Sequence, residues 1–157
     1  MKVYRLERVF AFFSDAGNLD AITPSWVGFR ILTPLPLAMR AGARIEYRLR
    51  LAGVPISWRT RIATWDPPRG FVDVQERGPY ALWEHTHGFA PCGDGVLMHD
   101  RVRYALPLGA LGRLAHLLAV RAALAAIFDH RFDRIRERFG AAPLLAPGTR
   151  AIREERA

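Results

Sequence analysis

The apolar residues in the last third of the chain recur every three or four positions. This spacing is typical of an amphipathic helix with one buried stripe, and it predicts a helix over residues 108–139 that ends at Gly140. A helix of that length is roughly 48 Å long, so its apolar stripe needs an equally long partner, for which a curved sheet is the obvious candidate. The predicted stripe consists of Leu111, Leu114, Leu118, Ala122, Ala125, Phe128, Phe132, Ile135 and Phe139.

The middle of the chain alternates between apolar and polar residues, which is typical of half-buried strands. Between residues 44 and 51, Ile45, Tyr47, Leu49 and Leu51 alternate with three arginines and a glutamate. Turn residues such as Gly53 separate further strands. One short strand candidate and one helix candidate precede them in residues 1–24. This order predicts an α+β domain whose sheet wraps a helix. The further strands are predicted over residues 26–33, 54–64, 71–77, 81–90 and 96–106.

Two neighbouring strands place polar side chains on the face that is expected to point inward. The first strand carries Trp83, His85, His87 and Phe89 on one face, and the second carries Met98, Asp100, Val102 and Tyr104. A two-residue turn at Gly93 and Asp94 sets Cys92 opposite Gly95. The resulting register pairs His87 with Asp100, His85 with Val102, and Trp83 with Tyr104.

The strand at 71–77 does not reveal its inner face from its pattern. If Phe71 points inward, Asp73 and Gln75 do so too, and the interior holds an unusual number of polar groups. Each of them costs roughly 1 to 3 kcal/mol to bury unless it finds a hydrogen-bond partner. The groups concerned are Tyr47, Asp73, Gln75, His85, His87, Asp100 and Tyr104.

Four interpretations of this polar interior are open, and we take them in decreasing order of preference. The first is a buried hydrogen-bond network that fixes strand register. The second is a cavity in which these groups orient a mostly apolar ligand. The third is acid–base chemistry with His87 polarised by Asp100. The last is a metal site built on His85 and His87 with Asp73 or Asp100; we expect no metal and no cofactor, because a carboxylate beside a histidine more often holds a proton.

The composition of the chain narrows the class of protein. With 157 residues, we expect one domain over residues 1–140 and a loosely ordered charged tail over 141–157. Lys2 is the only lysine, and the net charge of +8 is spread over arginines throughout the chain, so we expect no nucleic-acid partner. The single cysteine, Cys92, excludes an internal disulfide. No segment has the roughly 20 apolar residues of a membrane span, and the expected location is the cytoplasm.

Several segments together resemble the bacterial SRPBCC superfamily, the START-related, polyketide cyclase/dehydrase-like group with a helix-grip fold. They are residues 9–19 (VFAFFSDAGNL), 22–24 (ITP), Gly42 with 45–47 (IEY), 58–60 (WRT), 71–75 (FVDVQ), 78–80 (GPY), 83–87 (WEHTH), and 100–104 (DRVRY) with Pro107. The resemblance implies six or seven antiparallel strands around a C-terminal helix, with two short helices after the first strand and a hydrophobic tunnel between helix and sheet. Residues 1–7 leave little room for that first strand. Members of the superfamily bind lipids, sterols, polyketides or hormones, and some are aromatase/cyclases, with no shared catalytic residues.

From these observations we expect the chain to bind a small hydrophobic molecule, such as a lipid or polyketide, between helix and sheet, with a cavity of roughly 300 Å³ or more. A smaller interior would favour a structural network. The alternative is a cyclase or dehydratase in which His87 and Asp100 act as general base and Tyr104 donates to a substrate oxygen. A homodimer is one option for assembly. The predicted ligand-binding residues are Tyr47, Trp58, Asp73, Gln75, Trp83, His85, His87, Met98, Asp100, Tyr104, Leu118 and Phe128.

Overall fold

The computed structural model describes residues 5–51, 53–109, 114, 119–140 and 151–154. The chain begins with helix α1 (Leu6–Phe13) and three short 3₁₀ helices (Ala16–Asn18, Asp20–Ile22 and Ser25–Val27). The strands that follow are β1 (Arg30–Ile31), β2 (Arg44–Leu51), β3 (Val54–Asp66), β4 (Gly70–Arg77), β5 (Leu82–Cys92) and β6 (Gly95–Ala105). Helix α3 (Arg121–Phe139) and strand β7 (Ala151–Glu154) complete the described elements.

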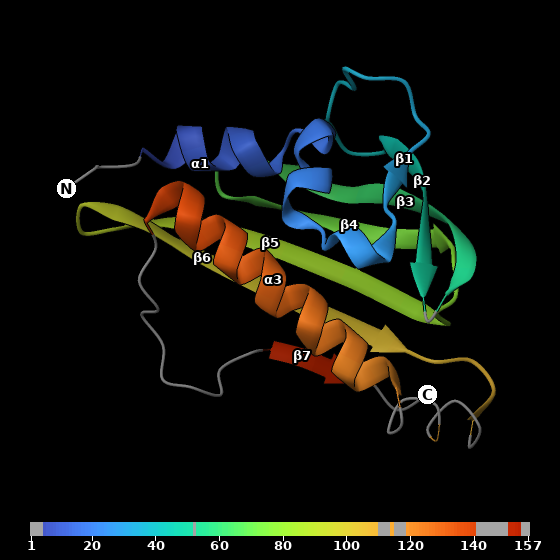
Figure 1. The fold of residues 1–157 in the computed structure, drawn as a ribbon. Helices are drawn as coiled ribbons and strands as arrows, with labels where there is room; N and C mark the ends of the chain where they lie inside the picture. The colour runs from blue at the N-terminus through green and yellow to red at the C-terminus, as the bar shows by residue number, and fades with distance from the viewer. Residues whose placement is uncertain (1–4, 52, 110–113, 115–118, 141–150, 155–157) are drawn as a thin grey trace.

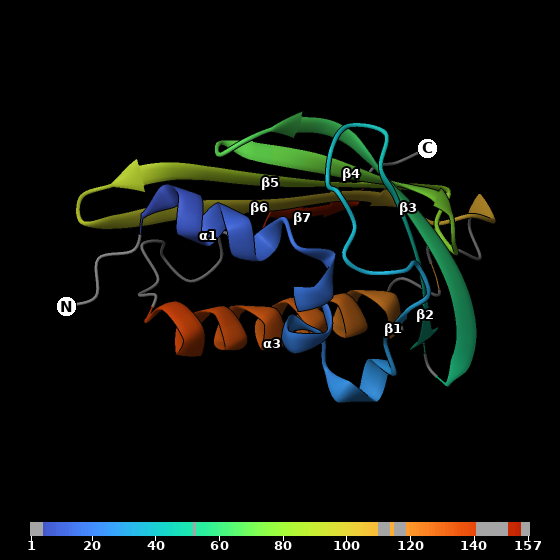
Figure 2. The same cartoon turned by 90° about the horizontal axis from the view of Figure 1, so that it is seen from above.

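The strands form one sheet in the order in which they follow each other along the chain. Strands β1 to β6 are antiparallel neighbours, and β7 lies parallel to β6. Helix α3 and the N-terminal helices lie on the same side of the sheet, and the β2–β3 end of the sheet curls toward them (Figure 1, Figure 2). The predicted α+β fold, with an antiparallel sheet, a long C-terminal helix and short N-terminal helices, is confirmed.

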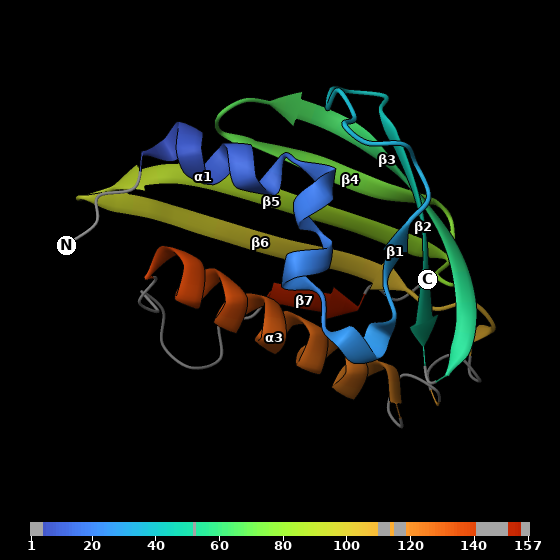
Figure 3. The same cartoon turned by 45° about the horizontal axis from the view of Figure 1, so that its top comes forward.

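Two segments differ from the prediction, and a third falls mainly outside the described residues. The strand expected over 26–33 forms only at Arg30–Ile31, because Ser25–Val27 is a 3₁₀ helix that Gly28 ends in the left-handed region with φ 57°. The first strand expected before the N-terminal helices would fall mainly on residues 1–4, which lie outside the described part, and α1 begins at Leu6. Four residues of the predicted tail, Ala151–Glu154, form β7 beside β6 (Figure 3).

Helix α3 presents a buried stripe that differs from the predicted one. Leu124 is buried, and Phe128, Ile135 and Phe139 are half-buried as the pattern predicted. Phe132, which was expected on the stripe, is 39% exposed. The inward positions are therefore residues 124, 128, 131, 135 and 139, three or four apart. This series brings an arginine, Arg131, onto the covered face. Two other members of the predicted stripe, Leu114 at 53% and Ala122, are also exposed. Leu111 and Leu118 lie outside the described residues.

The register predicted for β5 and β6 is confirmed. His87 pairs with Asp100, His85 with Val102, Trp83 with Tyr104 and Cys92 with Gly95. In β4, Phe71 is 6% exposed, so this strand turns Phe71 and Asp73 inward.

The core consists of two apolar clusters on the covered side of the sheet. The first joins the helix α1 phenylalanines to β3, β4 and β5, and its buried members are Val9, Phe10, Phe12, Phe13, Ile22, Ile62, Phe71 and Phe89. The second lies under α3, and its buried members are Val27, Leu49, Trp58, Tyr80, Val102, Tyr104 and Leu124.

The outer face of the sheet carries a group of arginines on β2 and β3, namely Arg44, Arg48, Arg50, Arg59 and Arg61. Several of them form ion pairs across strands: Arg44 and Arg61 both contact Glu76, and Arg59 contacts Glu46. Within the described residues, no helix is long and apolar enough to cross a membrane.

Gly70 allows β4 to approach β5 closely beside the polar interior. A methyl group at this position would overlap the backbone carbonyl oxygen of His87, whereas one at Gly88, the partner across the ladder, would meet His99 at an ordinary 3.6 Å. We expect Gly70→Ala to lower the free energy of unfolding by about 1 to 3 kcal/mol, since backbone must move to relieve the overlap. Gly88→Ala is the control and should have a smaller effect in urea unfolding. Equal effects would contradict this account.

Candidate functional site

Two histidines and two aspartates from three adjacent strands form a buried cluster on the covered face of the sheet. His85 and His87 lie two residues apart on β5 and are 5% and 7% exposed. Asp73 on β4 is opposite His85, and Asp100 on β6 is opposite His87. The imidazole rings lie side by side, with centroids 3.8 Å apart. The pleat of β5 therefore brings both rings between the two carboxylates.

The hydrogen bonds of the cluster run diagonally across the ladder. His85 bonds through Nε2 to Asp100, and His87 bonds through Nε2 to Asp73 Oδ2 at 2.9 Å. The second nitrogens face the opposite carboxylates at longer range: His85 Nδ1 lies 3.7 Å from Asp73 Oδ2, and His87 Nδ1 lies 3.5 Å from Asp100 Oδ1. Each imidazole thus lies between both acids, and the closest carboxylate of His87 is Asp73 rather than Asp100.

Aromatic rings enclose the imidazoles, and one arginine reaches them from α3. Phe71 stacks on His87 with centroids 4.2 Å apart, and Phe128 packs edge-on against His85 at 5.7 Å. Arg131, whose side chain is 14% exposed, places Nη1 3.9 Å from Asp100 Oδ2. Sequence reasoning missed Arg131, although its spacing of three from Phe128 and four from Ile135 would have placed it on the stripe.

Burial and neighbouring charges shift the pKa values of this cluster in opposite ways. Burial lowers the pKa of His87, and His85 lowers it further, against the opposing effect of the Asp73 hydrogen bond. Burial alone would raise the pKa of Asp100, but His85, His87 and Arg131 outweigh it, so the Asp100 pKa is lowered. A neutral His87 that donates from Nε2 to Asp73 has a lone pair on Nδ1, and this buried atom has no hydrogen-bond partner among the described residues.

A cavity of about 110 Å³ adjoins the cluster. Asp73, His85, His87 and Arg131 line it together with Tyr47 and Thr60, whose oxygens lie 3.2 Å apart. Burial raises the pKa of Tyr47, so its hydroxyl stays protonated. The rest of the wall is mostly apolar and comes from the N-terminal segment and the sheet: Phe13, Ala16, Leu19, Ile22, Met39, Ile45, Ile62, Phe71 and Trp83.

The predicted site residues occupy three kinds of position. Five line the cavity: Tyr47, Asp73, Trp83, His85 and His87.

Three more support that lining from behind. Trp58 donates from Nε1 to Thr60 at 3.0 Å, Asp100 contacts His85, and Phe128 packs on His85.

The others lie elsewhere. Gln75 binds the backbone of Tyr80, Tyr104 is 2% exposed and packs against Tyr80, and Met98 packs against the first core cluster. Leu118 lies outside the described residues. Sequence reasoning also missed Thr60 and the N-terminal wall, whose residues face the cavity only once the chain has folded back onto the sheet.

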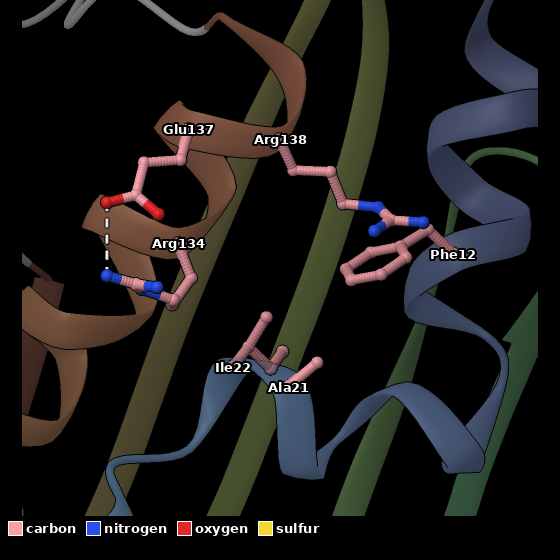
Figure 4. Close-up of a pocket in the computed structure, with 6 residues that line it drawn as sticks. All are labelled: Phe12, Ala21, Ile22, Arg134, Glu137 and Arg138. Atoms are coloured by element: carbon pink, nitrogen blue, oxygen red, sulfur yellow. Dashed lines mark hydrogen bonds and ion pairs between the residues drawn. The ribbon is translucent and has the colours of Figure 1, made fainter.

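A second pocket, of about 280 Å³, lies on the surface between α1, the second 3₁₀ helix and the end of α3 (Figure 4). Its rim is charged: Arg134 binds Glu137 at 3.0 Å, and the Arg138 guanidinium lies 4.4 Å from the ring centroid of Phe12. Arg134, Glu137 and Arg138 are exposed, so this pocket is an open depression with an apolar floor at Phe12 and Ile22.

Comparisons with known proteins support the fold. No family model and no curated protein matches the sequence. The structure is similar to that of protein Ms6760 from Mycobacterium smegmatis, with a TM-score of 0.61 and 12% identity over 88% of this chain and 85% of that one. It is also similar to TTHA0849 from Thermus thermophilus, with a TM-score of 0.57 and 20% identity over 87% of this chain and 90% of that one. A structural-genomics protein from Rhodobacter sphaeroides has a TM-score of 0.60 and 17% identity over 93% of this chain and 91% of that one. The chain thus shares the fold of these bacterial proteins, which is consistent with a helix-grip-like architecture.

The lowered pKa of Asp100 makes this residue a source of acid sensitivity. Below about pH 4 the unfolded chain takes up a proton at Asp100 that the folded chain does not, so stability is lost as the pH falls. We expect Asp100→Asn to cost about 3 kcal/mol at pH 7, because it leaves a buried ion pair without one partner. Between pH 6 and pH 3, urea unfolding should show a shallower loss of stability for this variant than for the unmodified chain.

Glu76→Gln is the matched control, since Glu76 is a carboxylate with a lowered pKa on the exposed face. Its substitution should cost less at pH 7, because solvent screens surface ion pairs. If the stability of Asp100→Asn depended on pH as that of the unmodified chain does, the lowered pKa of Asp100 would not be the source of the acid sensitivity.

Proposed function

We propose that the chain binds a small, mainly apolar molecule with a hydrogen-bonding group, in the cavity between the sheet, the N-terminal helices and α3. The observation that carries this proposal is the lining of the cavity, in which a mostly apolar wall surrounds a few polar side chains. Binding sites for small molecules generally have this composition, since apolar contact supplies affinity and few polar groups orient the ligand.

The size of the cavity narrows the class of ligand. A cavity of about 110 Å³ approaches the roughly 150 Å³ known to hold one benzene ring. It is well below the roughly 300 Å³ of sites for drug-sized molecules, and so too small for a whole lipid or polyketide. The proposed ligand is therefore a one-ring compound or a group of that size. By the volume criterion set from the sequence, a cavity of this size favours a purely structural network, and the experiment below separates that explanation from ligand binding.

The polar atoms that lack partners indicate what the ligand would offer. His87 Nδ1 can accept a hydrogen bond and Arg131 Nε can donate one, and neither has a partner in the described part of the chain. Both residues line the cavity. A phenol or a small carboxylic acid supplies both a donor and an acceptor on a small apolar body, and it matches these atoms better than a hydrocarbon.

An enzyme of the cyclase or dehydratase type is the second candidate, and the free lone pair of His87 favours it. A buried imidazole with Nε2 held by Asp73 could take a proton from a bound molecule at Nδ1. Tyr104 does not line the cavity, so the donor to a substrate oxygen would be Tyr47 instead. The sequence indicated Tyr104 as the donor to the substrate oxygen, and this role would pass to Tyr47.

Filling part of the cavity should weaken binding without unfolding the chain. We expect Ala16→Leu to occupy part of the space and to weaken the binding of phenol or benzoate at least tenfold, measured by ligand-observed NMR. Ala122→Leu is the matched control, since it makes the same change on the exposed face of α3 and should leave binding unchanged. Native mass spectrometry of the purified chain tests for a co-purified molecule in parallel.

The ligand proposal fails if no molecule co-purifies and no one-ring phenol or acid binds. It fails equally if Ala16→Leu and Ala122→Leu bind alike, because binding would then lie outside the cavity. Either outcome would leave the polar cluster as a structural network.

A further inference from the structure

Three side chains of the buried cluster present metal-ligating atoms to one point. The Oδ2 atom of Asp73 lies 2.9 Å from His87 Nε2 and 3.7 Å from His85 Nδ1, and one ligand atom from each residue can be chosen so that all lie within 4.8 Å of one another. Ligands held about 2.0 to 2.1 Å from a tetrahedral ion lie roughly 3.3 Å apart. The observed separations bracket this value, so an ion could enter with small side-chain movements.

The fourth member of the cluster stands where a supporting residue of a metal site is expected. A metal-binding imidazole usually donates its other N–H to a carboxylate or carbonyl, which fixes the ring and its tautomer. Asp100 contacts His85 at Nε2 and lies 3.5 Å from His87 Nδ1. These are the nitrogens that face away from Asp73, so one carboxylate would orient both rings.

The charges around the site favour a cation. Asp73 and Asp100 carry two negative charges, and Arg131, 3.9 Å from Asp100, supplies one positive charge. An imidazole binds a metal ion in its neutral form, so in the metal-bound state these side chains would leave a net charge of −1 for the ion to compensate. Buried charges are stable only when they are compensated, and a divalent ion beside Asp73 supplies the missing positive charge.

The rest of the fold holds the ligands in place and leaves room beside them. Asp73, His85 and His87 lie on adjacent paired strands, and the stacking of Phe71 on His87 restricts its ring. The same three residues line the 110 Å³ cavity. Three protein ligands with an adjoining space form the pattern of a site that keeps one position for water or a substrate.

We propose that Asp73, His85 and His87 bind a divalent first-row transition-metal ion, with Asp100 as the residue that orients both imidazoles. Such an ion would act as a Lewis acid toward a molecule in the cavity. The sequence pattern ranked a metal last, because one carboxylate beside a histidine usually shares a proton with it. The structure differs in having two carboxylates on opposite sides of the ring pair. The proposal does not rest on the ligand binding proposed above.

Zinc binding to the full-length, untagged chain tests the proposal. A Cys92→Ser background removes the exposed thiol, which could bind zinc by itself. Equilibrium dialysis with metal analysis should give one zinc ion per chain. We expect His85→Gln and Asp73→Asn each to weaken binding at least 100-fold, and Asp100→Asn to weaken it 10- to 100-fold. His99→Gln, on the exposed face of β6, is the control and should bind zinc like its parent.

A chain that binds no stoichiometric zinc, or whose affinity is unaffected by His85→Gln, would overturn the proposal, as would loss of binding in His99→Gln. Circular dichroism establishes that each variant is folded. If the cluster variants unfold, the visible absorption of cobalt(II) bound to the parent chain tests the proposal instead. Intense visible bands of four- or five-coordinate cobalt would support the site. The weak spectrum of hydrated cobalt would overturn it. Phenol binding measured on the same protein separates failure of the metal site from failure of the ligand proposal.

Discussion

The pairing of two buried imidazoles with two half-buried carboxylates is the interaction on which the rest of this site depends. Removing four ionisable groups from water is unfavourable unless each finds a compensating partner. Here the compensation comes from three strands at once, since β5 supplies both rings and β4 and β6 supply one acid each. The cluster lies between apolar neighbours, with Phe71 on one ring and Phe128 on the other, and its geometry follows the sheet.

This dependence on three strands explains how the fold controls the chemistry of the site. Helix α3 adds Arg131, whose positive charge helps to lower the Asp100 pKa, and the N-terminal helices close the cavity with Phe13, Ala16 and Ile22. No single segment contains the site. It exists only when the N-terminal turns and α3 are docked on the sheet, and a change that loosens either of them alters the polarity around the imidazoles as well as the packing.

The sequence was most informative where local geometry decides the outcome. A two-residue turn at Gly93 and Asp94 determined the β5–β6 register, and alternation identified the inner faces. It was less informative where a choice depends on distant elements. The pattern of β4 could not show whether Asp73 points inward, and pairing of His87 with Asp100 across the ladder did not reveal that the closest hydrogen bonds run diagonally. Arg131 was missed because a hydrophobicity pattern assigns charged residues to the exposed face, whereas its guanidinium is covered beside Asp100 and Phe128.

The atoms that the cluster leaves unpaired are the feature on which the proposed site and a purely structural network differ. A network that serves only to fix register gains its stability when every member is paired, and a buried polar atom without a partner costs about 1 to 3 kcal/mol. In the described residues, His87 Nδ1 and Arg131 Nε are two such atoms, and both side chains line the same cavity. Each of the two proposals made above would give these atoms a role: a hydrogen-bonding molecule would meet them directly, and an ion would reorganise the rings around Asp73.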